Sequence, residues 1–142
     1  MGDCLLHFAA KGKQTVTIYY LIQRGLDPRT VNKLGETAIY PACETGNIEI
    51  VSQLTQNKMV NDVREMLTNV DIFGNTCLHI AARDGNGEIC KYLVKKYKRL
   101  LKLDNQEGKT PLSYAQDNNH IYASNVLIEA GGEATYYDRT RK

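Results

Sequence analysis

Residues Gly74–Val94 read GNTCLHIAARDGNGEICKYLV, and this stretch decides the fold. Its first half places a Thr, a His and an Ala pair in one short apolar segment, and a glycine-containing turn follows. In its second half apolar residues recur at steps of three and four, at Ile89, Leu93 and Val94, as on one face of an amphipathic helix. The stretch therefore predicts two short helices joined by a tight turn.

The same pattern occurs four times along the chain. The copies begin at Gly2, Gly35, Gly74 and Gly108, at spacings of 33, 39 and 34 residues. Each copy continues into a second run with helical apolar periodicity, so each predicts a turn, a short helix, a second helix and an exit loop. Periods of about 20–50 residues are typical of stacked repeats.

The unit resembles the ankyrin repeat, a turn and two helices in about 33 residues with a Thr-Pro-Leu-His-x-Ala motif. The third copy matches best, with TCLHIAA from Thr76 to Ala82, and the fourth has the intact TPL at Thr110–Leu112. The second copy has Tyr40 where His is usual, and the first lacks its leading turn. The resemblance covers essentially the whole chain. It implies an all-α ankyrin-repeat solenoid of about four helix–turn–helix repeats with projecting β-hairpin turns.

We expect one repeat domain over residues 1–134, followed by a polar C-terminal tail over residues 135–142. The expected repeats span residues 1–31, 32–70, 71–104 and 105–134. The second repeat is longer by about six residues, and we place an insertion at 57–69. There Asn61 would cap a short extra helix with Val63, Met66 and Leu67 on its inner side. The alternative is a long loop that the fold tolerates.

The repeat gives its characteristic residues structural roles. Thr37, Thr76 and Thr110 stand where a hydroxyl can accept a hydrogen bond from an unpaired amide at the start of a helix. The resemblance implies that His7 and His79 tie the turn of one repeat to the next by hydrogen bonds. Ala pairs keep the first helices thin, so that layers can approach closely. The residues expected to fill the spaces between layers are Leu21, Ile50, Leu54, Leu93 and Leu127.

Residues that could carry catalysis or bind metal are better explained by the repeat. His7 and His79 both occupy its structural His position. Cys4 and Cys77 add zinc-ligand identities, but the two Cys–His pairs lie in non-adjacent repeats, too far apart for bonds of about 2.0–2.3 Å to one ion. The glycine-rich GNGE and GGEAT lack the Gly-Lys-Ser/Thr ending of a phosphate loop. We therefore expect no enzymatic activity, no metal and no cofactor.

Composition indicates the cellular compartment of the chain and the classes of partner that it can bind. The chain has 42% hydrophobic and 24% charged residues, and its net charge of +2 is too small to indicate nucleic-acid binding. Cys4, Cys43, Cys77 and Cys90 lie in apolar or small-residue surroundings without a Cys-x-x-Cys pair, which favours buried reduced thiols over disulfides. We expect a monomer in the cytoplasm, with the nucleus as the alternative, and no membrane partner.

Partner binding is expected on the concave wall formed by the turn tips and the exposed sides of the first helices. Leu34, Ile72 and Phe73 would form an apolar anchor, unless they pack locally against the neighbouring turns. Asp84, Asp104, Glu107 and Asp117 suit a basic segment of the partner, unless they are only a solvated face. The expected binding residues are Lys33, Leu34, Glu36, Glu44, Ile72, Phe73, Asn75, Arg83, Asp84, Asp104, Glu107 and Asp117.

Two hypotheses about function remain open. Ankyrin-repeat proteins are binding modules, so the resemblance implies an adaptor or targeting domain that binds another protein. The alternative is a short inhibitor that masks a transcription factor of the Rel/NF-κB type, a resemblance of size and fold only. The basic run from Lys95 to Lys102 would bind phosphate or an import receptor, or would simply offset the negative end of a helix dipole.

Overall fold

The computed structural model describes residues 2–56 and 63–134 of the chain. The elements of these residues are α1 Leu5–Lys11, α2 Thr15–Gln23, α3 Ile39–Thr45, α4 Ile48–Thr55, α5 Val63–Leu67, α6 Cys77–Arg83, α7 Gly87–Lys96, the 3-10 helix η1 Lys98–Lys102, α8 Pro111–Asp117 and α9 Ile121–Glu129. Within the described residues no helix is both long and apolar enough to cross a bilayer.

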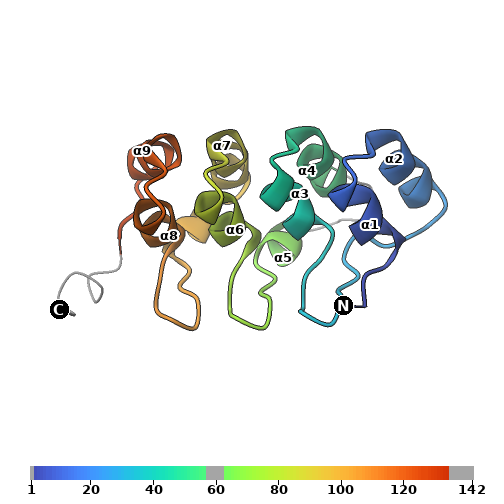
Figure 1. The fold of residues 1–142 in the computed structure, drawn as a ribbon, viewed down its shortest axis with the longest axis horizontal. Coiled ribbons are helices and arrows are strands. Elements are labelled where there is room, and N and C mark those ends of the chain that lie inside the picture. The colour runs from blue at the N-terminus through green and yellow to red at the C-terminus, as the bar shows by residue number, and fades with distance from the viewer. Residues whose placement is uncertain (1, 57–62, 135–142) are drawn as a thin grey trace.

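The helices form four antiparallel pairs stacked side by side. Figure 1 shows α1, α3, α6 and α8 in one layer, α2, α4, α7 and α9 in the other, and long turns projecting beyond the first layer. Each first helix contacts the next, from α1 to α3, α6 and α8, and each second helix does the same. We number the pairs as repeats one to four. The all-α solenoid is confirmed.

Small residues allow the first helices to pack closely. Ala9 and Ala10 in α1 are buried, as are Ala81 and Ala82 in α6. The predicted filling residues Ile50, Leu54, Leu93 and Leu127 are all buried in the second helices, whereas Leu21 is only partly buried. The core is therefore a continuous layer between the two rows of helices.

The projecting turns are hairpin-shaped, but no strand is assigned in the residues described. Each is closed by two backbone bonds, for example from Asp71 N to Asn75 O at 3.0 Å and from Gly74 N to Asp71 O at 2.9 Å. Single bonds join neighbouring turns, from Ile72 N to Leu34 O at 2.9 Å and from Gln106 N to Phe73 O at 3.1 Å. These isolated bonds hold the turns in a row without forming a sheet.

The predicted hydroxyl caps form in two of three cases. Thr76 accepts a hydrogen bond from His79 N, and Thr110 accepts one from Ser113 N. The prediction is wrong for Thr37, because α3 begins one residue later with Ala38 as its N-cap. The Thr37 hydroxyl is buried and has no hydrogen-bond partner among the described residues.

The described part of the predicted insertion forms α5. Met66 and Leu67 are buried, and Val63 packs against the core, so this segment is helical and not an open loop. The proposed Asn61 cap lies outside the described residues, as does the predicted tail at 135–142. The basic run starts in the last turn of α7 and continues through η1.

Candidate protein-binding surface

One polar side chain builds each projecting turn. In repeat three, Oδ1 of Asp71 accepts hydrogen bonds from Phe73 N and Asn75 N, both at 2.9 Å. Asn32 and Asn105 accept the equivalent pairs of bonds in the neighbouring turns. The glycine in the middle of each turn has positive φ, for example 80° at Gly74. The turn tips are therefore held in a fixed shape.

The imidazoles tie each turn to the next repeat. His7 Nδ1 accepts from Cys4 N at 3.1 Å, so its Nε2 carries the proton and donates to Glu36 O at 2.7 Å. His79 repeats this arrangement, accepting from Thr76 N and donating to Lys109 O at 2.9 Å. Burial lowers the pKa of His79, which favours the neutral ring. Both rings perform the structural role that the resemblance implied.

Tyr40 replaces the imidazole in repeat two, a role that sequence reasoning missed. Its hydroxyl lies 2.8 Å from Asn75 O, the carbonyl equivalent to Glu36 O and Lys109 O in the other turns. It also lies 2.7 Å from Asn69 O, beside the insertion. The signal was available, because a Tyr hydroxyl is a donor at the position where the repeat needs one.

Three of the predicted residues form what we call the apolar tip cluster: Leu34, Ile72 and Phe73. Leu34 is half-buried, whereas Ile72 and Phe73 are 50% and 57% exposed at the adjoining tip. The backbone bond from Ile72 N to Leu34 O keeps the two tips side by side. Ile72 and Phe73 therefore project from the row of turns with about half of their surface in solvent, beside the less exposed Leu34.

One predicted binding residue, Asn75, is placed differently. Its side chain is buried, and its Oδ1 accepts a hydrogen bond from Asn105 Nδ2 at 2.9 Å. Asn105 also donates to Tyr114 OH at 2.9 Å. Asn75 therefore links two turns and offers no surface to a partner. Tyr114 was not among the predicted binding residues. Its ring is half-buried, and the Lys109 ammonium lies 5.9 Å from the centroid of that ring.

Most of the predicted charges on the first helices are already paired. Arg83 donates two hydrogen bonds to Asp84, both at 3.1 Å, and its Nη2 lies 3.8 Å from Glu44. The Asp84 hydrogen bond raises the pKa of Arg83. Lys109 binds Asp117 at 2.7 Å. Asp84 and Asp117 therefore contribute less free negative charge than their number suggests.

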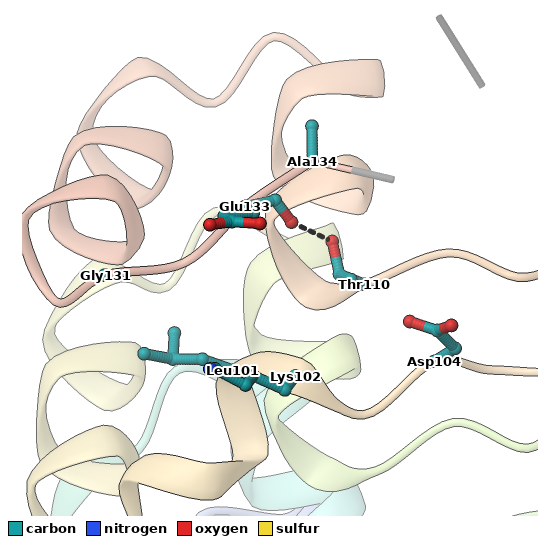
Figure 2. Close-up of a pocket in the computed structure, with 7 residues that line it drawn as sticks. All are labelled: Leu101, Lys102, Asp104, Thr110, Gly131, Glu133 and Ala134. Carbon is teal, nitrogen blue, oxygen red and sulfur yellow. Dashed lines mark hydrogen bonds between the residues drawn. The ribbon is translucent and has the colours of Figure 1, made fainter. Parts of the chain in front are cut away.

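Asp104 lies apart from the other predicted acids. It borders a hollow of about 320 Å³ together with Leu101, Lys102 and Glu133 (Figure 2). Glu107 stands at the tip of the fourth turn, where its carboxylate accepts a 3.3 Å hydrogen bond from Tyr114 OH. In the turn of repeat two, Lys33 is exposed and Glu36 is half-buried. The predicted acidic cluster is thus divided between the wall and this hollow.

The cysteines are free thiols, three of them buried. Burial raises the pKa of Cys90 to about 12 and also raises the pKa of Cys43, so both stay protonated and act as apolar filling. The described ranges contain no group of three or more His, Cys, Asp or Glu side chains placed to hold a metal ion.

A family model described as ankyrin repeats (3 copies) matches residues 6–96 and 56–138. The transient receptor potential cation channel subfamily A member 1 homolog of Caenorhabditis elegans is 28% identical over 129 residues, which are 91% of this chain and 10% of that protein. The B-cell lymphoma 3 protein homolog of Mus musculus is 26% identical over 126 residues, or 89% of this chain and 28% of that protein.

The NF-kappa-B inhibitor alpha of Sus scrofa is 33% identical over 89 residues, which are 63% of this chain and 28% of that protein. The chain thus spans less than a third of the length of each of these relatives. What they share with it is the repeat architecture.

Proposed function

Since this chain belongs to the ankyrin-repeat family and is a protein–protein interaction module, we propose that it binds one partner protein, without catalysis, through its turn tips and first helices. We call this surface the binding wall. It comprises the tips at residues 33–36, 72–74 and 106–109, together with the exposed sides of α3, α6 and α8.

The exposure of the apolar tip cluster carries the proposal. Ile72 and Phe73 are half exposed on a turn whose shape is fixed by Asp71 and Gly74, so their bulk does nothing for the turn itself. Rigid, half-exposed apolar groups lose little entropy when a partner covers them. Such residues at the centre of an interface supply most of its binding free energy.

Charge on the wall would orient the partner. Glu107 has no ion pair among the described residues. Glu44 is exposed, and its ion-pair partner Arg83, 3.8 Å away, also binds Asp84 at the shorter distance of 3.1 Å. A basic segment of the partner would fit these two carboxylates, mainly by speeding encounter and fixing orientation. Asp104 lies at the separate hollow and is not part of the binding wall.

The test is affinity capture from cell extract with immobilised wild type and with a Leu34→Ala/Phe73→Ala double variant. At least one protein should be retained by the wild type and lost from the double variant. Ile121→Ala, which removes a comparably exposed side chain from α9, is the matched control and should retain that protein. If the double variant captures the same proteins as the wild type, the binding wall is misplaced.

A second candidate function is inhibition of a transcription factor of the Rel/NF-κB type. The observation that favours it is the 33% identity to NF-kappa-B inhibitor alpha over 89 residues. By this proposal the chain masks the surface of the factor and releases it from DNA. Gel-shift titration of a purified Rel-type factor bound to its DNA site would decide. Loss of the shifted band with wild type, but not with the double variant, is expected.

A further inference from the structure

The basic run at residues 95–102 is folded against the core, with its charged side chains exposed. It contains five of the 18 Lys and Arg residues of the chain and none of the 16 Asp and Glu residues. Leu100 and Leu101 are 0% and 3% exposed and hold η1 against the core. Lys98, Arg99 and Lys102 are exposed. The backbone that carries these three cations is therefore fixed before any ligand binds.

The dipole of α7 accounts for only two of the five cations. Lys95 and Lys96 lie in the last turn of that helix, where positive charge offsets the negative end of its dipole. The other three cations belong to η1, beyond the end of α7. The burial of Leu100 and Leu101 also means that the run is not available to an import receptor as an extended segment. The charge of η1 therefore needs another explanation.

The three cations of η1 border a hollow of about 560 Å³. Gly131 on its other side follows α9, so the hollow lies between repeats three and four, on the side of the stack. Its volume is in the range of sites that bind small molecules. We call this site the basic hollow. The described residues that line it are Lys98, Arg99, Leu101, Lys102, Leu103 and Gly131.

The local geometry directs positive charge to this space and leaves room in it. Arg99 and Lys102 are three residues apart in a 3-10 helix, so their side chains lie on the same face. Lys98 lies opposite Gly131, where an added β-carbon would be 4.0 Å from Lys98 Cε. Because Gly131 has no side chain, the space beside the Lys98 ammonium stays open for a ligand.

These cations have no acidic partner in the part of the chain that the structure describes. Lys98, Arg99 and Lys102 form no ion pair there. The loop after α2 is different, because Arg29 donates hydrogen bonds to Asp27 at 3.0 and 2.9 Å. The fold therefore pairs the charge of one inter-repeat loop internally and leaves that of η1 for a ligand.

Two carboxylates lie near the basic hollow but outside it. Asp104 and Glu133 border the adjoining hollow of about 320 Å³, which shares Leu101, Lys102 and Gly131 with the basic hollow (Figure 2). Neither carboxylate pairs with Lys102 within residues 2–56 and 63–134. An anionic ligand is therefore favoured in the basic hollow and disfavoured in its neighbour.

We propose that the basic hollow binds a small polyanion that carries several phosphate groups close together, either free in solution or as the headgroup of a lipid. Exposed ion pairs contribute little one at a time, so the ligand must engage several cations at once. Lys and Arg both bind phosphate oxygens, Arg as a fork and Lys as a point charge. A nucleic-acid backbone would instead need a basic groove that tracks along the surface, whereas this charge is confined to one loop.

Isothermal titration calorimetry with myo-inositol hexakisphosphate at low ionic strength tests the proposal. The wild type should bind it, and added salt should weaken the binding. Arg99→Gln/Lys102→Gln should weaken it by about tenfold or more, because two of the three cations are lost. Lys98→Gln, tested singly, should weaken it as well. All three side chains are exposed, so the melting temperatures should stay near that of the wild type.

Arg24→Gln/Lys91→Gln is the matched control. It removes the same net charge from two exposed residues outside the hollow and should bind as tightly as the wild type. The Leu34→Ala/Phe73→Ala variant of the binding wall should also bind the polyanion normally, so failure of one proposal leaves the other standing. The proposal is overturned if the wild type does not bind, if the control loses as much affinity as Arg99→Gln/Lys102→Gln, or if inorganic phosphate binds as tightly. Tighter binding of duplex DNA would overturn it in favour of a nucleic-acid site.

A vesicle arm identifies the source of the phosphate groups. Sedimentation with phosphatidylcholine vesicles, with and without phosphatidylinositol bisphosphate, measures binding to a headgroup. Retention on the phosphorylated vesicles alone, with release by myo-inositol hexakisphosphate, supports the proposal with a lipid as the source. Calorimetric binding without vesicle retention supports it with a free polyanion as the source. Equal retention on both kinds of vesicle would contradict recognition of phosphate groups.

Discussion

At the residue scale, one hydrogen-bond position explains why a His, a Tyr and a second His can serve the same purpose. His7, Tyr40 and His79 all contact the carbonyl that closes the next turn. The sequence motif predicted this role for the two histidines. The same role for Tyr40 was missed, although a Tyr hydroxyl at that position can donate the equivalent bond; only its second partner, Asn69 O beside the insertion, required the structure.

The pairing of charges was harder to predict. Asp3–Lys11 and Lys109–Asp117 join equivalent positions of two repeats, eight residues apart on the turn and the end of the first helix. Repeat two has Glu at both positions, Glu36 and Glu44, so no such pair can form there. A comparison of charges at equivalent positions of the repeats would have predicted these two ion pairs. Helical periodicity alone could not, because the turn intervenes.

Substitution of the helix-start threonines should separate a working cap from an idle hydroxyl. Thr76→Val should lower the free energy of unfolding by about 1–2 kcal/mol, because the amide of His79 loses its acceptor. Thr37→Val should leave it unchanged or raise it by up to about 1 kcal/mol, because a buried hydroxyl without a partner is removed. Urea titrations measure both. Equal losses in the two variants would contradict the assignment.

The buried imidazole should make stability depend on pH. Burial holds the pKa of His79 below its unfolded value of 6.5, so below this pH the unfolded chain binds a proton that the folded chain does not. Stability from this group is therefore complete above pH 6.5 and declines as pH falls toward the folded pKa. Thermal unfolding of His79→Gln should show a flatter decline in this window than the wild type. Parallel curves would refute the prediction.

At the element scale, apolar periodicity predicts the second helices of the repeats, and the repeat motif predicts the first helices. The short α5 was predicted only as an alternative to a loop. Five residues carry too little periodicity to decide between them, and its stability comes from burying Met66 and Leu67 against the core. Tertiary packing therefore determines this helix.

The insertion should contribute to stability, which a tolerated loop would not. Leu67→Ala should lower the free energy of unfolding by about 2–5 kcal/mol, because Leu67 is fully buried and its truncation leaves a cavity. Glu65→Ala, on the exposed side of the same helix, is the control and should change it little. Denaturant unfolding monitored by circular dichroism measures both. A near-neutral Leu67→Ala would mean that α5 is not part of the core.

At the scale of the whole molecule, the side chains that recur in every repeat are buried in contacts between the layers. The residues at the turn tips and at the two ends of the stack are free to vary. The stack of paired helices could be predicted from sequence, because every repeat carries the same pattern of residues. The differences in exposure between equivalent positions, such as Phe8 and Ile80, could not, because they emerge only from the three-dimensional structure.

The most direct measurement is the affinity of a captured partner for the wild type and for Phe73→Ala, by isothermal titration calorimetry, with the melting temperatures of both proteins recorded. Phe73 is 57% exposed, so its removal should weaken binding by about 2 kcal/mol or more and leave the melting temperature nearly unchanged. Unchanged affinity, or a melting temperature that falls as it would for a core residue, would show that the turn tips serve the fold and not a partner.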